Sequence, residues 1–170
     1  TIKNMKKLLY KGKLNWKGIN HELELYESDD ISDLEFINQC QAVPFVDEDN
    51  IVLFKHIDGY YSLPGGTVEK GESFEKTLKR EVMEESSCEI LDYKLIGYVK
   101  DTDLSSRKVK YQLRYWAKVK PLDQSIQDPA GKAIAREIVN INEANEKLGW
   151  GERGQVLLDL AKRKYNETAK

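Results

Sequence analysis

The segment of residues 63–88, LPGGTVEKGESFEKTLKREVMEESSC, constrains the fold more than any other part of the chain. It begins with Pro64 and the double glycine Gly65 and Gly66, which predict a loop whose backbone approaches a ligand closely. From Glu72 to about Ser86 the spacing predicts a helix, because apolar residues recur every four positions, at Phe74, Leu78 and Val82. The segment therefore predicts a glycine loop followed directly by an amphipathic helix.

Three acids lie on one face of this expected helix. Glu81, Glu84 and Glu85 are spaced i, i+3 and i+4, so they fall inside an arc of ~100°. Like charges at this spacing repel one another, and we therefore expect a cation against them. Carboxylate oxygens select Mg²⁺, Mn²⁺ or Ca²⁺, and the absence of a nearby set of His or Cys ligands argues against zinc.

The same segment resembles the signature box of the Nudix hydrolases, G-x5-E-x7-R-E-U-x-E-E-x-G-U, where U is a bulky aliphatic residue. The positions that match in register are Gly66, Glu72, Arg80, Glu81, Val82, Glu84 and Glu85. Two positions depart from the pattern, since Ser87 replaces the last glycine and Cys88 replaces an aliphatic residue. If position 87 needs a positive φ, serine costs about 1 kcal/mol relative to glycine, but no metal ligand is lost.

The rest of the chain predicts an α+β domain. Alternating apolar and polar residues predict strands over residues 35–46, 51–56, 90–101, 108–120 and 137–141, and a second helix is expected from Glu152 to about Lys164. Antiparallel groups of strands around two main helices indicate a layered α+β fold. The resemblance covers about residues 35–165 and implies the Nudix-type α/β/α sandwich with a mixed central sheet.

Two parts of the chain are distinguished in this prediction. Residues 35–170 form the expected Nudix hydrolase domain, and residues 1–34 form an N-terminal extension of short strands, with turns at Gly12 and Gly18. The extension resembles the extra strands with which ADP-ribose-type members dimerise, so it is a candidate dimerisation element and a homodimer is left open.

The resemblance implies a role for each residue of the box. Glu81, Glu84 and Glu85 are the expected catalytic residues and ligands of one to three Mg²⁺ ions, with Mn²⁺ as an alternative metal and the carbonyl of Gly65 as a further ligand. Glu72 and Arg80 are the expected ion pair that shapes the loop and helix. The general base differs among members, and it is either one of these glutamates or an acid of a later loop, for which Glu137 and Asp128 are the candidates.

Substrate contacts are expected from Gly66 and from the two tyrosines before the loop. Tyr60 and Tyr61 are adjacent on an extended segment and so point to opposite sides, which predicts that one packs in the core and the other is available to stack on a base.

The implied reaction is attack of water on one phosphorus of a nucleoside diphosphate linked to a group X, which makes the protein a Nudix pyrophosphohydrolase, a hydrolase of phosphorus anhydrides. A nucleoside triphosphate and a nucleotide-sugar both stay open as substrate. The proline that marks the ADP-ribose-cleaving branch about fifteen residues past the box is absent, whereas the N-terminal strands resemble that branch. Ser87 and Cys88 leave a second class open, a nucleotide-binding regulator that keeps the fold without turnover, although the intact glutamates argue against it.

Composition limits the classes of binding partner, and the cellular compartment, that we expect for this protein. With 27 Lys and Arg against 29 Asp and Glu the net charge is −2, and the isoelectric point near 5.8 argues against a nucleic-acid polymer as partner. No stretch approaches the ~18 apolar residues of a membrane span. Cys40 and Cys88 are too few and too far apart for a disulfide framework, which favours reduced thiols in a cytoplasmic protein acting on a small molecule.

Overall fold

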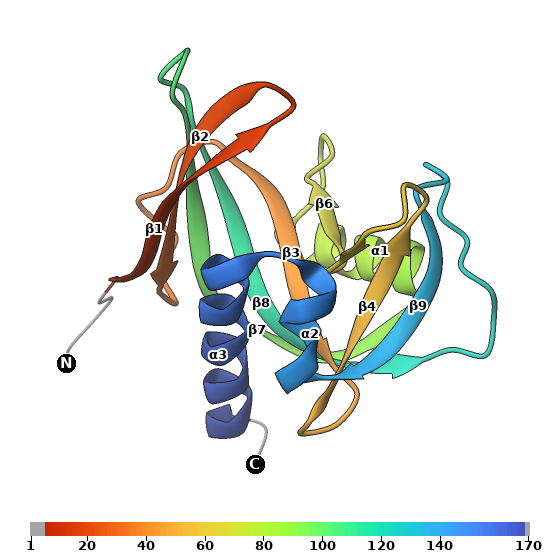
Figure 1. Cartoon of the computed structure of the whole chain (residues 1–170). Helices are drawn as coiled ribbons and strands as arrows, with labels where there is room; N and C mark the ends of the chain where they lie inside the picture. Colours follow the sequence, from red (N-terminus) through yellow and green to blue (C-terminus); the bar gives the residue numbers. More distant parts are fainter. Residues whose placement is uncertain (1–5, 169–170) are drawn as a thin grey trace.

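Nine strands form one mixed sheet in the computed structural model, which describes residues 6–168 (Figure 1). The sheet order is β1-β2-β7-β8-β3-β4-β5, with β6 paired to β3 and β9 paired to β4. The pair β3–β8 is parallel, and the other pairs are antiparallel. The strands are β1 (Lys7–Trp16), β2 (Ile19–Glu27), β3 (Ile37–Phe45), β4 (Asn50–His56), β5 (Tyr61–Ser62), β6 (Gly65–Thr67), β7 (Cys88–Asp103), β8 (Val109–Pro121) and β9 (Ala133–Asn140).

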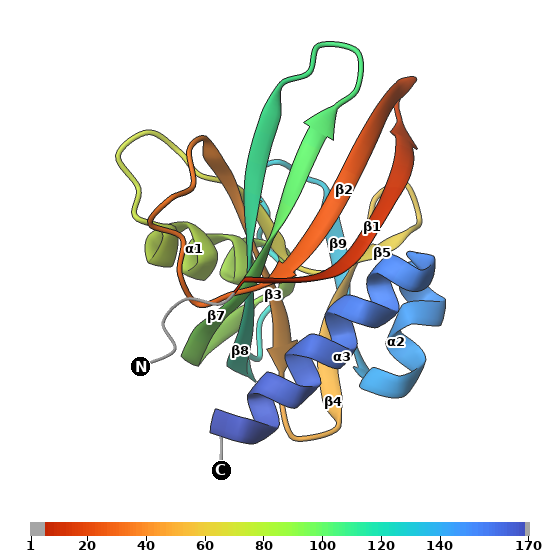
Figure 2. The same cartoon turned by 90° about the vertical axis from the view of Figure 1, so that its left-hand side faces the viewer.

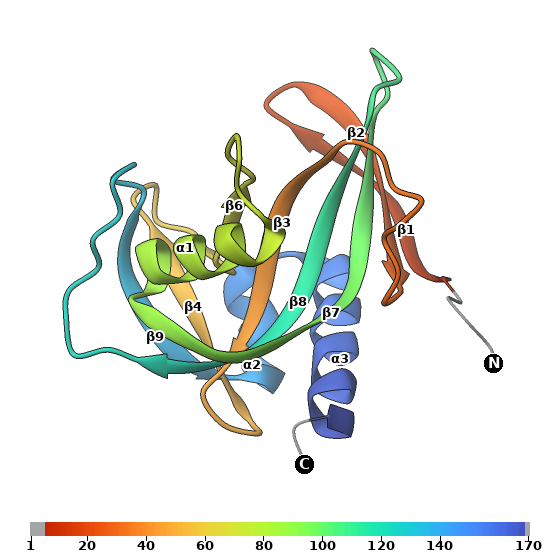
Figure 3. The same cartoon turned by 180° about the vertical axis from the view of Figure 1, so that it is seen from behind.

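Three helices cover the two faces of this sheet: α1 (Phe74–Ser86), α2 (Ile141–Leu148) and α3 (Gly151–Thr168). Figure 2 shows α1 on one side and α2 with α3 on the other, and Figure 3 shows α1 in front of β3 and β4. The expected α+β sandwich with a mixed sheet is confirmed. None of the helices within residues 6–168 is long and apolar enough to cross a membrane.

The two faces of the sheet bury two separate cores because side chains alternate along each strand. On β3, Cys40 packs with Leu78 and Val82 of α1, whereas Val43 packs with Leu148 and Leu158 of the other helices. Cys40 and Cys88 are free and completely buried. Central strands buried on both faces hold α1 firmly on one side of the sheet.

The N-terminal strands extend the sheet through the pairing of β2 with β7. The predicted turn at Gly18 is confirmed, because Lys17 and Gly18 both have positive φ between the paired residues Trp16 and Ile19. The predicted turn at Gly12 is wrong: Gly12 lies inside β1, where the Tyr10 ring occupies the space that a Cβ would need.

A helix that the sequence did not predict follows β9. The expected strand 137–141 begins earlier, at Ala133, and ends at Asn140, whose side chain caps α2 by accepting a hydrogen bond from the Asn142 N–H at 2.9 Å. Gly149 ends α2 in the left-handed conformation with φ 67°. The helix at the box likewise begins at Phe74, after the cap Ser73, and not at Glu72.

Candidate active site

Helix α1 places its acids beside the glycine loop. Leu78 and Val82 are fully buried against the sheet and fix the rotation of the helix, so that Glu81 and Glu85 are directed toward β6. The N–H of Gly65 donates to Glu85 Oε1 at 2.8 Å. A Cβ on Gly66 would collide with the carboxylate of Glu81, so that carboxylate packs directly on the loop backbone.

The loop itself is anchored to β3. The Pro64 carbonyl accepts a hydrogen bond from the Ala42 N–H at 3.0 Å, and the buried side chain of Gln41 donates to the Leu63 carbonyl at 3.2 Å. Gly65 pairs with Gln41, and a side chain on Gly65 would strike the backbone of β3. Glycine is therefore required where the loop, the strand and the acids meet.

Glu81, Glu84 and Glu85 form the carboxylate cluster of the site, and burial has the largest effect on the pKa of Glu81 and of Glu85. It raises the pKa of Glu85 to about 8, and the charges of Glu81, Asp128 and Glu84 add to the rise while the Gly65 N–H opposes it. Burial also raises the pKa of Glu81, against the hydrogen bond from Arg80. These groups are costly to ionise as they stand, which is the situation that a bound cation relieves.

Arg80 is shared between the cluster and Glu72. Its Nε and Nη2 donate to the two oxygens of Glu72 at 2.8 and 3.0 Å, which is a bidentate pair, and its Nη1 reaches Glu81 at 2.8 Å and Glu84 at 3.3 Å. Glu72 also accepts from the Glu69 N–H and the Thr77 hydroxyl. These bonds, that from Arg80 first, lower the pKa of Glu72 to about 2. Glu72 is thus a fixed anion that holds the guanidinium between the loop and the helix.

The two acids proposed from later loops lie on different faces of the sheet. Asp128 accepts from three backbone N–H groups, those of Ala130, Lys132 and Ala133, and its charge contributes to the raised pKa of both Glu81 and Glu85. Glu137 instead pairs with Lys147 of α2 at 2.7 Å. The preceding residue, Arg136, donates to carbonyls at the end of α1, so strand alternation directs Glu137 to the opposite face. Only Asp128 is brought toward the carboxylate cluster.

The two tyrosines have different surroundings. Tyr60 is 45% exposed and stacks on His56 with ring centroids 4.3 Å apart. Tyr61 packs against the core on the α2 and α3 side, and the Lys147 ammonium lies 5.0 Å from its ring centroid.

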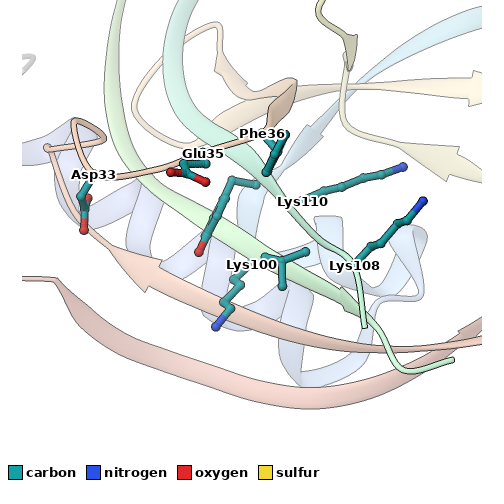
Figure 4. Close-up of a pocket in the computed structure, with 8 residues that line it drawn as sticks. Asp33, Glu35, Phe36, Lys100, Lys108 and Lys110 are labelled. Carbon is teal, nitrogen blue, oxygen red and sulfur yellow. The ribbon is translucent and has the colours of Figure 1, made fainter. Parts of the chain in front are cut away.

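A pocket of about 650 Å³ elsewhere on the protein contains none of the box residues. It lies between the β7–β8 hairpin and residues 33–36, and its lining includes Phe36, Lys100, Lys108 and Lys110 (Figure 4).

The comparison with known families agrees with the geometry of the box. A model of the NUDIX domain matches residues 39–160. The chain belongs to the Nudix hydrolase family. This confirms the family and the enzyme class predicted from the box.

Solved Nudix structures show the same fold. A mutant of the Bacillus subtilis pyrophosphohydrolase BsRppH has a TM-score of 0.69 at 20% identity, over 92% of this chain and 98% of that one. A NUDIX hydrolase from Nitrosomonas europaea has a TM-score of 0.60 at 21% identity, over 76% and 90%. A structure described as an ADP compounds hydrolase has a TM-score of 0.58 at 17% identity, over 98% and 97%. No curated protein matches the chain.

The Nudix cluster fits a hard divalent cation by the chemistry of its donors. As the side chains stand, no group of three or more His, Cys, Asp or Glu within residues 6–168 is arranged to hold a metal ion, since Arg80 engages Glu81 and the Gly65 N–H engages Glu85. The cluster nevertheless offers carboxylate oxygens against a glycine backbone that leaves room for them.

Sequence reasoning gave no role to two arginines of this Nudix domain, Arg114 on β8 and Arg153 on α3. Both are largely removed from solvent, and burial lowers the pKa of each. The available signal was a single cation inside the otherwise apolar strand segment of residues 113–117.

Proposed function

We propose that this Nudix hydrolase cleaves the pyrophosphate linkage of a nucleoside diphosphate linked to a group X, in a reaction that requires Mg²⁺. One observation carries the proposal: two carboxylates of α1, those of Glu81 and Glu85, meet the Gly65–Gly66 backbone in a site where burial raises the pKa of Glu85 to about 8. The nearby cation, Arg80, is already bound by Glu72 and cannot neutralise the whole cluster.

Each residue of the site has a defined part in this proposal. Glu81, Glu84 and Glu85 would hold the metal, with the Gly65 carbonyl as a further ligand and with Mn²⁺ as an alternative ion. When bound, the divalent cation neutralises phosphate charge and lowers the pKa of a water molecule. The Gly65 N–H fixes the carboxylate of Glu85, and Glu72 holds the Nε and Nη2 of Arg80, so that only its Nη1 is left to contact Glu81 and Glu84.

The proton of the attacking water needs an acceptor near the reacting phosphorus. The cluster glutamates are candidates, because any of these carboxylates that is ionised when the site is occupied can accept this proton. Asp128 is the later-loop acid favoured by its position, whereas Glu137 faces α2. Water oxygen bonds to phosphorus, the bond to the bridging oxygen breaks, and the products are a nucleoside monophosphate and phosphoryl-X.

The substrate is a nucleoside triphosphate or a nucleotide-sugar in this proposal. The names of the structural neighbours support the general class, since one is called a pyrophosphohydrolase and another an ADP compounds hydrolase. We also propose a cytoplasmic enzyme, supported by two buried free thiols, and a homodimer formed through the edge strand β1 of the N-terminal extension.

A substrate panel tests the proposal. Nucleoside triphosphates, ADP-ribose and dinucleoside polyphosphates are incubated with the protein in Mg²⁺ or in EDTA, and the products are identified by chromatography and mass spectrometry. We expect release of a nucleoside monophosphate in Mg²⁺ alone. Glu85→Gln should reduce the rate by at least about 10²-fold, whereas Glu146→Gln, which changes an exposed acid on α2, should not. Tight nucleotide binding without turnover of any substrate would overturn the proposal in favour of a regulator.

A further inference from the structure

Arg114 is a buried cation without an anionic partner. It is 4% exposed, and its Nη1 and Nη2 donate to neutral acceptors, the side-chain oxygens of Gln39 at 3.3 Å and Gln112 at 3.0 Å and the Leu113 carbonyl at 3.2 Å. Its Nε has no partner. Buried charges in proteins are normally paired, so an unpaired guanidinium in a sheet needs a reason.

A second guanidinium lies on the same side of the sheet, on the helix that packs against β8. Arg153, in the first turn of α3, stacks over the Trp150 ring at 4.7 Å, and its charge contributes to the lowered pKa of Arg114. Among the described residues 6–168, neither arginine forms an ion pair within 4 Å. Two cations that repel each other on the same face favour a ligand rich in hydrogen-bond acceptors.

Other buried polar atoms on this face also lack partners. They are Gln41 Oε1, Trp116 Nε1 and Asn145 Oδ1. Gln41 is the β3 neighbour of Arg114, Trp116 lies two residues further along β8, and Asn145 projects from α2 toward Gly154 of α3. Unsatisfied polar atoms of this kind are uncommon in native proteins, and their concentration between the sheet and α2–α3 marks a polar site.

A pocket of about 250 Å³ opens beside these groups, between the β1–β2 hairpin, the β7–β8 hairpin and the start of α3. We call it the hairpin pocket. Leu14, Leu23 and Trp16 supply its apolar lining, and its polar lining is Gln112, Arg153 and the His21–Asp101 pair, whose nearest atoms are 2.7 Å apart. Pockets that enclose a whole drug-sized ligand measure about 300–1,000 Å³, so the hairpin pocket suits one ring system of a larger ligand.

The sheet register connects Arg114, whose partner Gln112 lines the hairpin pocket, to the loop beside the carboxylate cluster. Arg114 pairs with Gln41, Gln41 pairs with Gly65, and the Gly65 N–H donates to Glu85. Neighbouring strands are about 4.8 Å apart, so the backbones of Arg114 and Gly65 are separated by about 10 Å. A nucleotide with its phosphates at the cluster would span this distance with its sugar and base.

We infer that the hairpin pocket binds the base of the substrate, and that Arg153 selects a base edge with two adjacent acceptors, as guanine and hypoxanthine have. This inference rests on the proposed function. A guanidinium donates bidentately to O6 and N7 of such a base, whereas adenine presents an amino donor beside its N7. Trp16, which is 54% exposed, offers its ring for stacking. Arg114 is a positioning residue, because it binds Gln112 Oε1 and so directs the Gln112 amide group toward Asp101.

The test compares GTP, ITP and ATP as substrates, and GMP, IMP and AMP as ligands in metal-free buffer by calorimetry. We expect kcat/KM and affinity to favour the guanine and hypoxanthine nucleotides by about 10- to 100-fold. Arg153→Gln should remove this preference, and Arg163→Gln, a matched change at an exposed arginine of α3, should keep it. Trp16→Ala provides a second variant at a half-exposed position and should weaken the binding of all three monophosphates.

The outcomes separate this inference from the proposed function. Metal-dependent turnover with equal rates for the three triphosphates, unchanged in Arg153→Gln, would overturn the base inference and leave the function intact. Binding of GMP that depends on Arg153, in the absence of any turnover, would support the base pocket and overturn the hydrolase proposal.

Discussion

Replacing Ser87 by glycine is expected to stabilise the protein and leave its activity unchanged. Ser87 ends α1 with φ 50° and ψ 44°, the left-handed conformation that glycine adopts without a steric penalty. The residue is also 1% exposed, and its hydroxyl has no hydrogen-bond partner. The family pattern has glycine here, and both features of Ser87 raise the free energy of the folded state.

The size of the effect follows from four contributions. A left-handed non-glycine residue costs about 1–2 kcal/mol, and an unsatisfied buried hydroxyl costs about 1–3 kcal/mol. Against these, glycine loses about 0.5–1 kcal/mol more backbone entropy on folding, and removal of the packed side-chain carbon costs about 0.8 kcal/mol. We expect Ser87→Gly to raise the free energy of unfolding by about 1–2 kcal/mol, with a rise of about 2–4 °C in Tm for each kcal/mol.

Urea and thermal unfolding in metal-free buffer measure this change, and two further variants separate its causes. Ser87→Ala removes the hydroxyl and keeps the strained Cβ, so its gain in stability measures the contribution of the unsatisfied hydroxyl alone. Arg107→Gly relieves a φ of 65° at an exposed turn and should show the backbone contribution alone. The reasoning is refuted if Ser87→Gly is no more stable than wild type, or if Ser87→Ala gains no stability at all. Turnover should be equal in all of these proteins, because none of the changes touches the carboxylate cluster.

Three other changes test the site. In the metal-free protein the pKa of Glu85 is about 8, against 4.5 in the unfolded chain, so its contribution to stability is present below pH 4.5 and is lost as the pH rises through 8. The free energy of unfolding in urea should therefore fall more from pH 5 to pH 9 for wild type than for Glu85→Gln. Equal falls in the two proteins would contradict the burial argument. Gly66→Ala should displace the Glu81 carboxylate and reduce kcat by about 10²-fold with an unchanged circular dichroism spectrum, and wild-type kcat would show that this contact is unimportant. Glu72→Gln should free Arg80 to compete for Glu81 and Glu84, which would raise the Mg²⁺ concentration needed for half-maximal activity; an unchanged Mg²⁺ titration would exclude that competition.

The parts of the fold that were predicted correctly depend on local patterns. Helix α1 could be predicted because its buried residues recur at helical spacing, and the long strands could be predicted because apolar and polar side chains alternate along them. Helix α2 was missed because Ile141 continues the apolar pattern of β9, so the short helix looked like the end of a strand. Its two end signals, Asn140 and Gly149, were present in the sequence.

In the candidate site, too, the sequence predicts the residues that lie within one element, and it does not predict those that packing brings together. Glu81, Glu84 and Glu85 lie within one helix, so their common face follows from their spacing alone. The choice between Asp128 and Glu137 depends on which side of β9 faces α1, and that phase is fixed by Arg136 and its contacts with the end of the helix. Arg114 and Arg153 meet only because α3 packs on β8, which no local pattern contains.

The distance between the carboxylate cluster and the two arginines lets both act on one anionic substrate. At an effective dielectric constant of 20, opposite unit charges attract by about 4 kcal/mol at 4 Å and by about 1.7 kcal/mol at 10 Å. The Arg114 backbone is about 10 Å from that of Gly65 by strand spacing, so its charge would attract a nucleotide without supplying the contact charge that a divalent cation would provide among the glutamates. Arg80 contacts Glu81 and Glu84, but Glu72 already holds it in a bidentate pair, so it neutralises only part of the cluster. A mutation of Arg153 can consequently change the recognition of the base while the carboxylates keep their geometry. Arg153→Gln should therefore lose the preference for a base, whereas Glu85→Gln should lose turnover.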